Sequence, residues 1–422
     1  MGYSFFKITS LQKPFRDKLA TFVNTLGSAI RDGKTISFAD NDIGHVLQLQ
    51  NERLKKKGLV MDYEVYDRDK KRHATVGSQW QDAHYQSYVC HEQYGVKRRI
   101  TKNGQKIYSD NKRNILYTTI TDVTNGVHPD GETICCPNCG SVSTIAELQG
   151  GCPSCGTRYK MDDLFPKVTG YYFLEDVAIA GTEHIKGIAI GAGIAYVFNF
   201  FIMLISLLIS GEGSFLKVIL GMVVLVPLSI FLGYVLFSIF MMVRLIAVGS
   251  SQSSGKWGTI GSRNKFEQKM KTVCPEFSYE YFTSKAISLI KAAIYSENEQ
   301  ELMFYKGGPL DPVFKDVIDL NFGAALGIDS FTVENGIVTV TAKAYFDVLY
   351  ATDNGIKFQR DMFGAVFRRR IDIPVDMGFS MTKIQCPTCG SSFNAMKNKV
   401  CPYCGNVYDI ESKDWVLVRL ER

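Results

Sequence analysis

Two long uncharged segments constrain this chain more than any other feature. Gly187–Ser210 contains 24 residues and Val218–Val243 contains 26, and neither segment has a charged side chain. An α-helix rises about 1.5 Å per residue, so even the shorter segment spans roughly 36 Å, enough to cross a hydrocarbon core of about 30 Å. The connector, residues 211–217, is short, so the two helices must be antiparallel neighbours. The sequence therefore predicts a two-helix transmembrane hairpin.

Smaller details of these segments support the hairpin. Gly187, Gly191 and Ala195 recur every four residues and form a small-residue face that allows close helix contact. Pro227 lies inside the second segment, where we expect a kink that transmembrane helices tolerate. The alternative, a pair of buried helices in a large soluble core, is disfavoured by the length of both segments.

The charges around the hairpin predict its orientation. Between Arg244 and Lys271 the chain has six basic residues and one acidic residue, Glu267, whereas the connector has one charge of each sign. Basic residues are enriched on the cytoplasmic side of membrane proteins. We therefore expect both termini in the cytoplasm and only the connector on the other side.

The basic segment after the hairpin, residues 244–273, is also a candidate lipid-binding surface. Apolar side chains lie among its basic ones, and each Lys or Arg close to an anionic headgroup surface contributes about 1 kcal/mol. The candidate residues are Lys256, Trp257, Arg263, Lys265, Phe266, Lys269 and Lys271. The alternative is a solvated linker that only sets the orientation. Membrane lipid with anionic headgroups is thus an expected partner.

Eight of the eleven cysteines fall in four copies of the motif C-P-x-C-G. The first pair of motifs lies within 135–157 and the second within 386–405. The predicted metal ligands are Cys136, Cys139, Cys152, Cys155, Cys386, Cys389, Cys401 and Cys404. Two residues between cysteines let both sulfurs reach one ion, and the following glycine permits positive φ. Four thiolates fill a tetrahedral zinc ion, so we predict two structural zinc ions, each in a zinc ribbon.

The zinc sites also indicate a cellular compartment. Thiolate ligands must stay reduced, so both ribbons should face a reducing compartment, in agreement with the charge pattern. A redox role for the C-x-x-C pairs is the alternative, but redox motifs of this kind occur singly on a βα unit. The prediction is a multi-pass protein of a bacterial plasma membrane with cytoplasmic termini.

The region after residue 274 predicts an α+β domain. Phe277–Ile294 has apolar residues at helical spacing, and we predict a second helix over Asp311–Leu326. Asp329–Glu334 and Ile337–Ala344 flank Asn335-Gly336, a type I′ hairpin signal. The remaining predicted strands are Tyr345–Thr352, Lys357–Arg369 and a closing strand from Trp415, with the second ribbon inserted before the last.

This order of elements resembles the C-terminal domain of the mitochondrial inner-membrane import subunit Tim forty-four, a family with many bacterial members. The resemblance covers residues 274–422 and is carried by the Asn335-Gly336 strand pair and the following segments: Pro275–Ser278, Phe282, Arg360–Arg368 and Trp415–Leu417. It implies a cone-shaped sheet like that of nuclear transport factor two, with helices packed on it and an apolar pocket. It also implies association with anionic lipid and a role near protein translocation. Similar bacterial members carry a C-P-x-C-G ribbon before the Trp-containing strand, whereas the mitochondrial protein lacks the ribbons and the hairpin.

Residues 1–185 are expected to form a second α+β domain that is a diverged copy of the C-terminal one. The apolar stripe from Phe15 to Leu26 matches the stripe from Phe282 to Ala293, and each half continues through a β-rich region, a ribbon and an apolar strand. The interpretation equates the turn Asn103-Gly104 with Asn335-Gly336. The alternatives are that only the ribbon was duplicated and that the basic segment Met1–Arg31 is a mitochondrial transit peptide.

The sequence predicts binding rather than catalysis. All six histidines precede the second apolar segment, and no nucleophile-and-base arrangement is evident. The basic stretch Lys97–Arg113, beside a ribbon, could suit nucleic acid, but it also fits the charged face of a β-hairpin, so nucleic acid is not an expected partner. We predict a non-enzymatic, membrane-anchored binding or scaffold protein with an unidentified protein partner, linked to protein translocation or membrane-protein handling. The alternatives are a pocket for a small molecule or lipid, and a nucleic-acid-binding protein tethered to the membrane.

Overall fold

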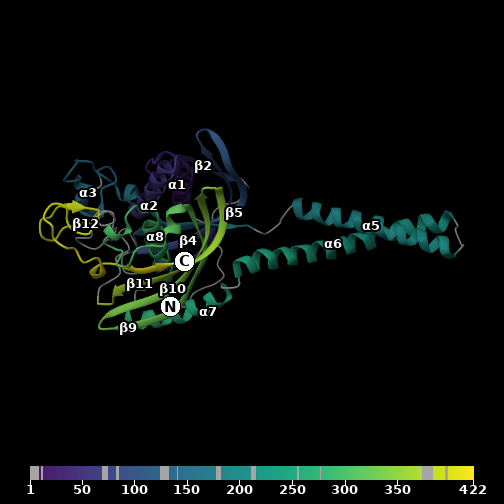
Figure 1. Cartoon of the computed structure of the whole chain (residues 1–422). Helices are drawn as coiled ribbons and strands as arrows, with labels where there is room; N and C mark the ends of the chain where they lie inside the picture. The colour runs from purple at the N-terminus through teal and green to yellow at the C-terminus, as the bar shows by residue number, and fades with distance from the viewer. Residues whose placement is uncertain are drawn as a thin grey trace. The chain divides into compact units, whose positions relative to one another are not determined.

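The computed structural model describes residues 9–10, 13–68, 75–81, 85–123, 133–139, 141–176, 182–210, 215–253, 256–275, 277–372, 384–394 and 398–422. These residues form a mixed α+β structure with two larger antiparallel sheets and two long apolar helices (Figure 1). The chain divides into two compact units. The hairpin unit is Asp176–Gly255, and the sheet unit combines Met1–Glu175 with Lys256–Arg422.

The hairpin unit consists of α5 (Thr182–Ser210) and α6 (Phe215–Ser253), which lie side by side. Their apolar spans, Ile185–Ser206 and Ile219–Val243, are each long enough to cross a membrane. Only 6% and 11% of the most apolar windows are buried, whereas a soluble protein would bury such helices in its core. Two exposed apolar helices of this length indicate a membrane protein.

The predicted small-residue face of α5 lies against α6. A Cβ atom added to Gly187 would lie 2.1 Å from the ring of Phe237, and one added to Gly191 would lie 3.0 Å from the carbonyl oxygen of Gly233. Glycine at these positions therefore lets the two backbones approach closely. The helix α6 continues through Pro227.

The first half of the sheet unit starts with two helices and continues into a sheet. The elements are β1 (Thr9–Ser10), α1 (Lys13–Asp32), α2 (Asn41–Lys56), β2 (Leu59–Asp67), β3 (Thr75–Gln81), β4 (Tyr85–Lys102), β5 (Gln105–Val123) and β8 (Lys167–Glu175). The long strand β4 pairs with β2 and β3 on one side and with β5 on the other, and β8 pairs with β5. Between β5 and β8 lie β6 (Thr133–Cys135), β7 (Val142–Thr144), α3 (Ile145–Gly150) and α4 (Met161–Leu164).

The second half again places helices before a sheet. The elements are α7 (Lys256–Val273), α8 (Tyr279–Tyr295), the 3-10 turns Glu299–Glu301 and Pro312–Asp316, β9 (Val317–Glu334), β10 (Ile337–Thr352), β11 (Gly355–Arg370) and β14 (Val416–Glu421). The sheet order is β14-β11-β10-β9, and every pair is antiparallel. Between β11 and β14 lie β12 (Ile384–Gln385), β13 (Ser392–Phe393) and the 3-10 turn Ile410–Ser412.

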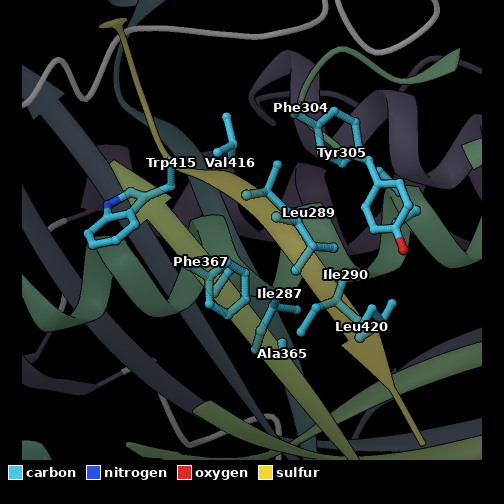
Figure 2. Packing of buried hydrophobic residues seen from close by; sticks show 14 of the residues in the cluster. Ile287, Leu289, Ile290, Phe304, Tyr305, Ala365, Phe367, Trp415, Val416 and Leu420 are labelled. Atoms are coloured by element: carbon cyan, nitrogen blue, oxygen red, sulfur yellow. The ribbon is translucent and has the colours of Figure 1, made fainter. Parts of the chain in front are cut away.

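The main core of the second half lies between α8 and this sheet. Ser278 caps α8 by accepting a hydrogen bond from the Tyr281 N–H at 3.2 Å. Figure 2 shows Leu289 and Ile290 of α8 beside Phe367 of β11 and Leu420 of β14, and all four are buried. Full burial of one large apolar side chain contributes about 1.5–3 kcal/mol, so this face fixes the helix on the sheet.

The two halves repeat one strand connectivity. In each, the strand before the ribbon pairs with the strand after it, β5 with β8 and β11 with β14. Each of these pairings contains one register shift: between Thr119 and Ile120 on β5, and between Val366 and Phe367 on β11. In both sheets, the shift lies between the second and third residue pairs counted from the ribbon. The halves therefore agree in the strand pair that flanks each ribbon and in the position of its bulge, although the first sheet has six strands and the second has four.

A further pair of equivalent contacts follows the helices α1 and α8. The loop after α1 forms an isolated parallel bridge from Ala39 to Val168 of β8, and the loop after α8 forms one from Tyr305 to Leu417 of β14. Each last strand is thus held by a loop that follows the equivalent helix. This agrees with the match between the α1 and α8 apolar stripes that the sequence predicted.

The two Asn-Gly turns, in contrast, are not equivalent. Asn103-Gly104 joins β4 to β5, and its counterpart by connectivity is the turn at 353–354 between β10 and β11. Asn335-Gly336 joins β9 to β10. Asn103 and Asn335 have φ of 49° and 51°, and their glycines also have positive φ, so both form the same local turn. An Asn-Gly pair predicts the geometry of a turn but not which two strands the turn joins. Equating the two turns was therefore wrong.

One predicted element of the second half was also wrong. Asp311–Leu326, predicted as a helix, is a 3-10 turn followed by the first part of β9. Four consecutive residues, Val317–Leu320, are buried, so the apolar spacing does not distinguish a strand from a helix. The segment predicted as a linker, 244–273, contains the end of α6, which reaches Ser253, and the helix α7, which starts at Lys256.

The two halves, predicted as separate domains, belong to one unit. Shared apolar clusters and buried polar contacts join them. Asp319 of β9 accepts hydrogen bonds from Arg98 of β4 at 2.7 Å and from Gln50 of α2 at 2.9 Å. Lys285 of α8 forms ion pairs with Asp42 of α2 at 2.9 Å and with Asp414 at 3.0 Å. These side chains are at most 10% exposed, so water does not replace either partner.

We predict that Asp319→Ala destabilises the sheet unit by about 3 kcal/mol or more, since it leaves Arg98 and Gln50 buried with a missing acceptor. Urea unfolding of the full chain in mild detergent, followed by tryptophan fluorescence, measures the change. Asp329→Ala is the matched control, because Asp329 forms an exposed ion pair with Lys343 and should cost at most about 1 kcal/mol. Equal effects of the two substitutions would contradict the importance of the buried contact.

Candidate metal centres

The first group of four cysteines lies between β5 and β8. The sulfur atoms of Cys136, Cys139, Cys152 and Cys155 lie within 4.8 Å of one another. Cys136 Sγ is 3.8 Å from Cys155 Sγ, and Cys139 Sγ is 3.7 Å from Cys152 Sγ. Tetrahedral coordination with metal–sulfur bonds of about 2.3 Å places sulfurs roughly 3.8 Å apart. The separations fit one tetrahedral ion.

The second group has the same geometry between β11 and β14. Cys386, Cys389, Cys401 and Cys404 also lie within 4.8 Å of one another. Cys386 Sγ is 3.6 Å from Cys404 Sγ, and Cys389 Sγ is 3.7 Å from Cys401 Sγ. All eight predicted ligands are therefore brought together as two sets of four, and none of them forms a disulfide.

The local sequence explains how each motif positions its sulfurs. Gly390 and Gly405 have φ of 71° and 70°, which glycine adopts without strain. Their N–H groups donate to the carbonyl oxygens of Cys386 and Cys401 at 2.8 and 2.9 Å. These bonds close a tight turn around each C-x-x-C pair, as the motif predicted. Gly156 forms the same turn in the first group, with φ of 72°.

Both groups suit structural metal sites. Four sulfur ligands complete a tetrahedral coordination shell, which leaves no position for a substrate or a reactive water. The second group is joined to the main core, where Cys386 and Cys401 are buried in one cluster with Trp415. The first group packs in a smaller cluster of its own with Ile145, Leu148 and other apolar residues.

The predicted lipid-binding residues do not form one exposed surface. Phe266 is 2% exposed because it packs into the core, with its ring 5.5 Å from that of Phe282, so its assignment to a lipid surface was wrong. Arg263 pairs with Glu280 and Lys271 pairs with Glu267. Lys265 and Lys269 are exposed on α7. The side chains of Lys256 and Trp257 lie outside the described part of the structure.

The basic stretch of the first half lies on the β4–β5 hairpin, where much of its charge is paired. Arg98 pairs with Asp110 and Asp319, and Arg99 pairs with Asp62 at 2.8 Å. Sequence reasoning did not identify Asp319 as a partner, because it lies more than 200 positions away in the chain. The one local indication of a buried role for Asp319 was its position as an acidic residue inside the apolar run Val317–Leu320.

No family model, curated protein or solved structure matches this chain.

We predict that Cys389→Ser and Cys139→Ser each reduce the metal content by one ion per chain. Because the second group is joined to the main core, Cys389→Ser should lower the stability of the sheet unit more than Cys139→Ser does. Elemental analysis gives the metal content, and urea unfolding gives the stability. Thr388→Ser, in the same turn but without a ligand atom, is the control. The structural assignment fails if both cysteine variants keep the full metal content.

Proposed function

We propose that this protein is a non-enzymatic, membrane-anchored binding or scaffold protein with both termini on the cytoplasmic face of a bacterial plasma membrane. The observation that carries the proposal is that the segments before and after the hairpin fold into one unit. Buried ion pairs between them require both segments on the same side of the membrane. Two antiparallel spans return the chain to its starting side, so the hairpin acts as an anchor for that unit.

The cytoplasmic orientation has two independent supports. Six basic residues between Arg244 and Lys271, against one acid, favour the cytoplasmic side. The two four-cysteine groups require thiolates, which persist in a reducing compartment. Zinc is the metal we propose for both, because it prefers closed tetrahedral sulfur sites without redox chemistry. Elemental analysis giving two zinc ions per chain is the expected result.

The proposed family assignment is the Tim forty-four-like domain, and it rests on the order of elements after α7. A helix, three antiparallel strands, a ribbon and a closing strand directly after Trp415 follow one another as in the family. Trp415 is buried against Phe282, with ring centroids 4.7 Å apart, so two residues that carry the resemblance share one core contact. The cone-shaped fold of nuclear transport factor two and a role near protein translocation belong to this proposal. The shared strand connectivity supports an origin of the two halves by duplication.

A difference between the two ribbons favours a protein partner. Val400, Tyr403 and Val407 of the second ribbon are 42%, 69% and 72% exposed. The residues at the matching positions of the first ribbon are Gly151, Ser154 and Arg158. Since the first ribbon shows that the fold does not need apolar residues there, their exposure fits a contact with an apolar segment of another protein.

The alternatives have weaker support. Nucleic acid would need free basic side chains, but Arg98 and Arg99 are held by acidic residues of this chain. Anionic lipid remains a proposed partner through the exposed side chains of Lys265 and Lys269. Both lie on α7, the helix that begins three residues after the end of α6.

We predict that a cytoplasmic reporter fused after Arg422 is active and that a cysteine placed at Ser214 reacts with a membrane-impermeant thiol reagent from outside intact cells. The native protein, whose metal-ligating cysteines would all be cytoplasmic, is the control and should not react. If the native cysteines react from outside and a cysteine at position 214 does not, the orientation is the opposite of the one proposed, and the cytoplasmic placement is refuted.

We predict that a photo-crosslinking amino acid at Tyr403 gives a discrete protein adduct in native membranes, because this side chain is exposed on the same ribbon as the exposed Val400 and Val407. The same amino acid at Ser154, its counterpart in the first ribbon, is the control and should give no such adduct. Mass spectrometry of the adduct identifies the partner. Identical patterns from both positions, or none from either, would count against the binding role of the second ribbon.

A further inference from the structure

A partly open cavity of about 150 Å³ is lined by both halves of the sheet unit. One wall comes from β4, β5 and β8 of the first half, and the other comes from α7, α8 and β9 of the second half. An engineered protein cavity of roughly this size accommodates a benzene ring. The cavity is therefore large enough for a ligand built on one aromatic ring.

Aromatic side chains form one side of this cavity. Tyr117 and Tyr172 are stacked, with ring centroids 5.1 Å apart and planes at 7°, and Phe322 meets Tyr172 edge to face at 5.3 Å. Aromatic rings prefer such offset-stacked and edge-to-face contacts, so a flat ring has partners along this wall. Tyr172 is half-buried, and desolvation raises the pKa of its phenol, so this ring is uncharged at neutral pH.

A cationic, an acidic and a polar side chain also line the cavity: Arg263, Glu280 and Thr283. Arg263 of α7 lies over the Tyr279 ring at 4.7 Å and pairs with Glu280 through one guanidinium nitrogen, Nη2. The guanidinium has five N–H donors, so this contact leaves others for a planar anion. The hydroxyl of Thr283 is buried in the cavity wall, beside the Tyr279 side chain.

The backbone beside the cavity is also unusual. Ala324 has φ of 56°, in the left-handed region that costs a residue with a Cβ roughly 1 kcal/mol or more. It lies where β9 bulges away from β10, between the partners Phe322 and Leu326. Such bulges commonly lie beside functional sites, since they redirect a strand around a space.

We propose that this cavity binds a small aromatic carboxylate, with its ring against Tyr172 and Phe322 and its carboxylate on Arg263. The cavity size limits the ligand to one ring, the aromatic wall selects a flat ring, and the guanidinium selects a planar anion. This cavity is separate from the proposed protein-binding surface of the second ribbon. The test of ligand binding therefore does not depend on the proposed scaffold role.

The test uses the purified full chain, loaded with metal, in mild detergent. Benzoate is titrated by saturation-transfer NMR and by its effect on thermal unfolding. Benzamide keeps the ring without the charge, acetate keeps the charge without the ring, and phenyl phosphate replaces the planar anion by a tetrahedral one. Benzoate should bind about tenfold or more tightly than each of the other three.

Arg263→Gln should weaken benzoate binding about tenfold or more and leave benzamide unchanged. Arg360→Gln is the matched control, because Arg360 also pairs with acids, Asp347 and Glu175, and lies over an aromatic ring, but outside this cavity. Metal content and circular dichroism verify that each variant is folded. The comparison of benzoate with benzamide on the native protein remains decisive if Arg263→Gln does not fold. Failure of all four probes to bind, equal binding of benzoate and benzamide, or equal effects of the two substitutions would overturn the proposal.

Discussion

The buried carboxylate of Asp319 is the contact on which the arrangement of the sheet unit depends. It lies on the first long strand of the second half and accepts hydrogen bonds from two elements of the first half, through Arg98 and Gln50. Arg98 is held in place by a second acid, Asp110, so its charge is compensated from both halves. Because a buried charge without a partner is costly, neither half can leave the other without exposing or neutralising these groups. The ion pairs of Lys285 with Asp42 and Asp414 add a second link of the same kind.

Because the two halves are joined, the hairpin is an insertion into one folded unit. Two transmembrane helices inserted between independent domains would impose no relation between those domains. Here the chain leaves the sheet unit after Glu175 and returns to it at Lys256. Both ends of the hairpin are therefore connected to the same folded unit. The same unit contains Lys291, a buried amine on α8 whose pKa burial lowers to about 8. Apolar side chains of both halves also share the two larger core clusters, with Val46 and Leu49 in one and Ile318 and Leu349 in the other.

The two halves share the position of the ribbon but differ in the side chains that attach and surround it. Each inserts a four-cysteine group between two paired strands, β5 and β8 or β11 and β14, and bulges at the same pairing. The second ribbon is merged with the main core and exposes apolar residues, while the first has its own small core and a polar surface. A metal site stabilises its ribbon without a large core of its own, so the surface of each ribbon is free to differ.

The sequence by itself determined the features that depend on local patterns. The apolar segments specified the two long helices, the spacing of the C-P-x-C-G motifs specified which sulfurs meet, and each Asn-Gly pair specified a tight turn. These succeed because length, ligand spacing and backbone freedom act over a few residues. The sequence could not show that Phe266 lies in a core and not on a membrane surface, because a basic helix with apolar residues suits both environments. It did not show that Val317–Leu320 is a strand, since a fully buried run has no period. The joining of the two halves and the cavity between them were decided by the tertiary structure alone, because Arg98 and Asp319, or Tyr172 and Arg263, meet only once both sheets have formed.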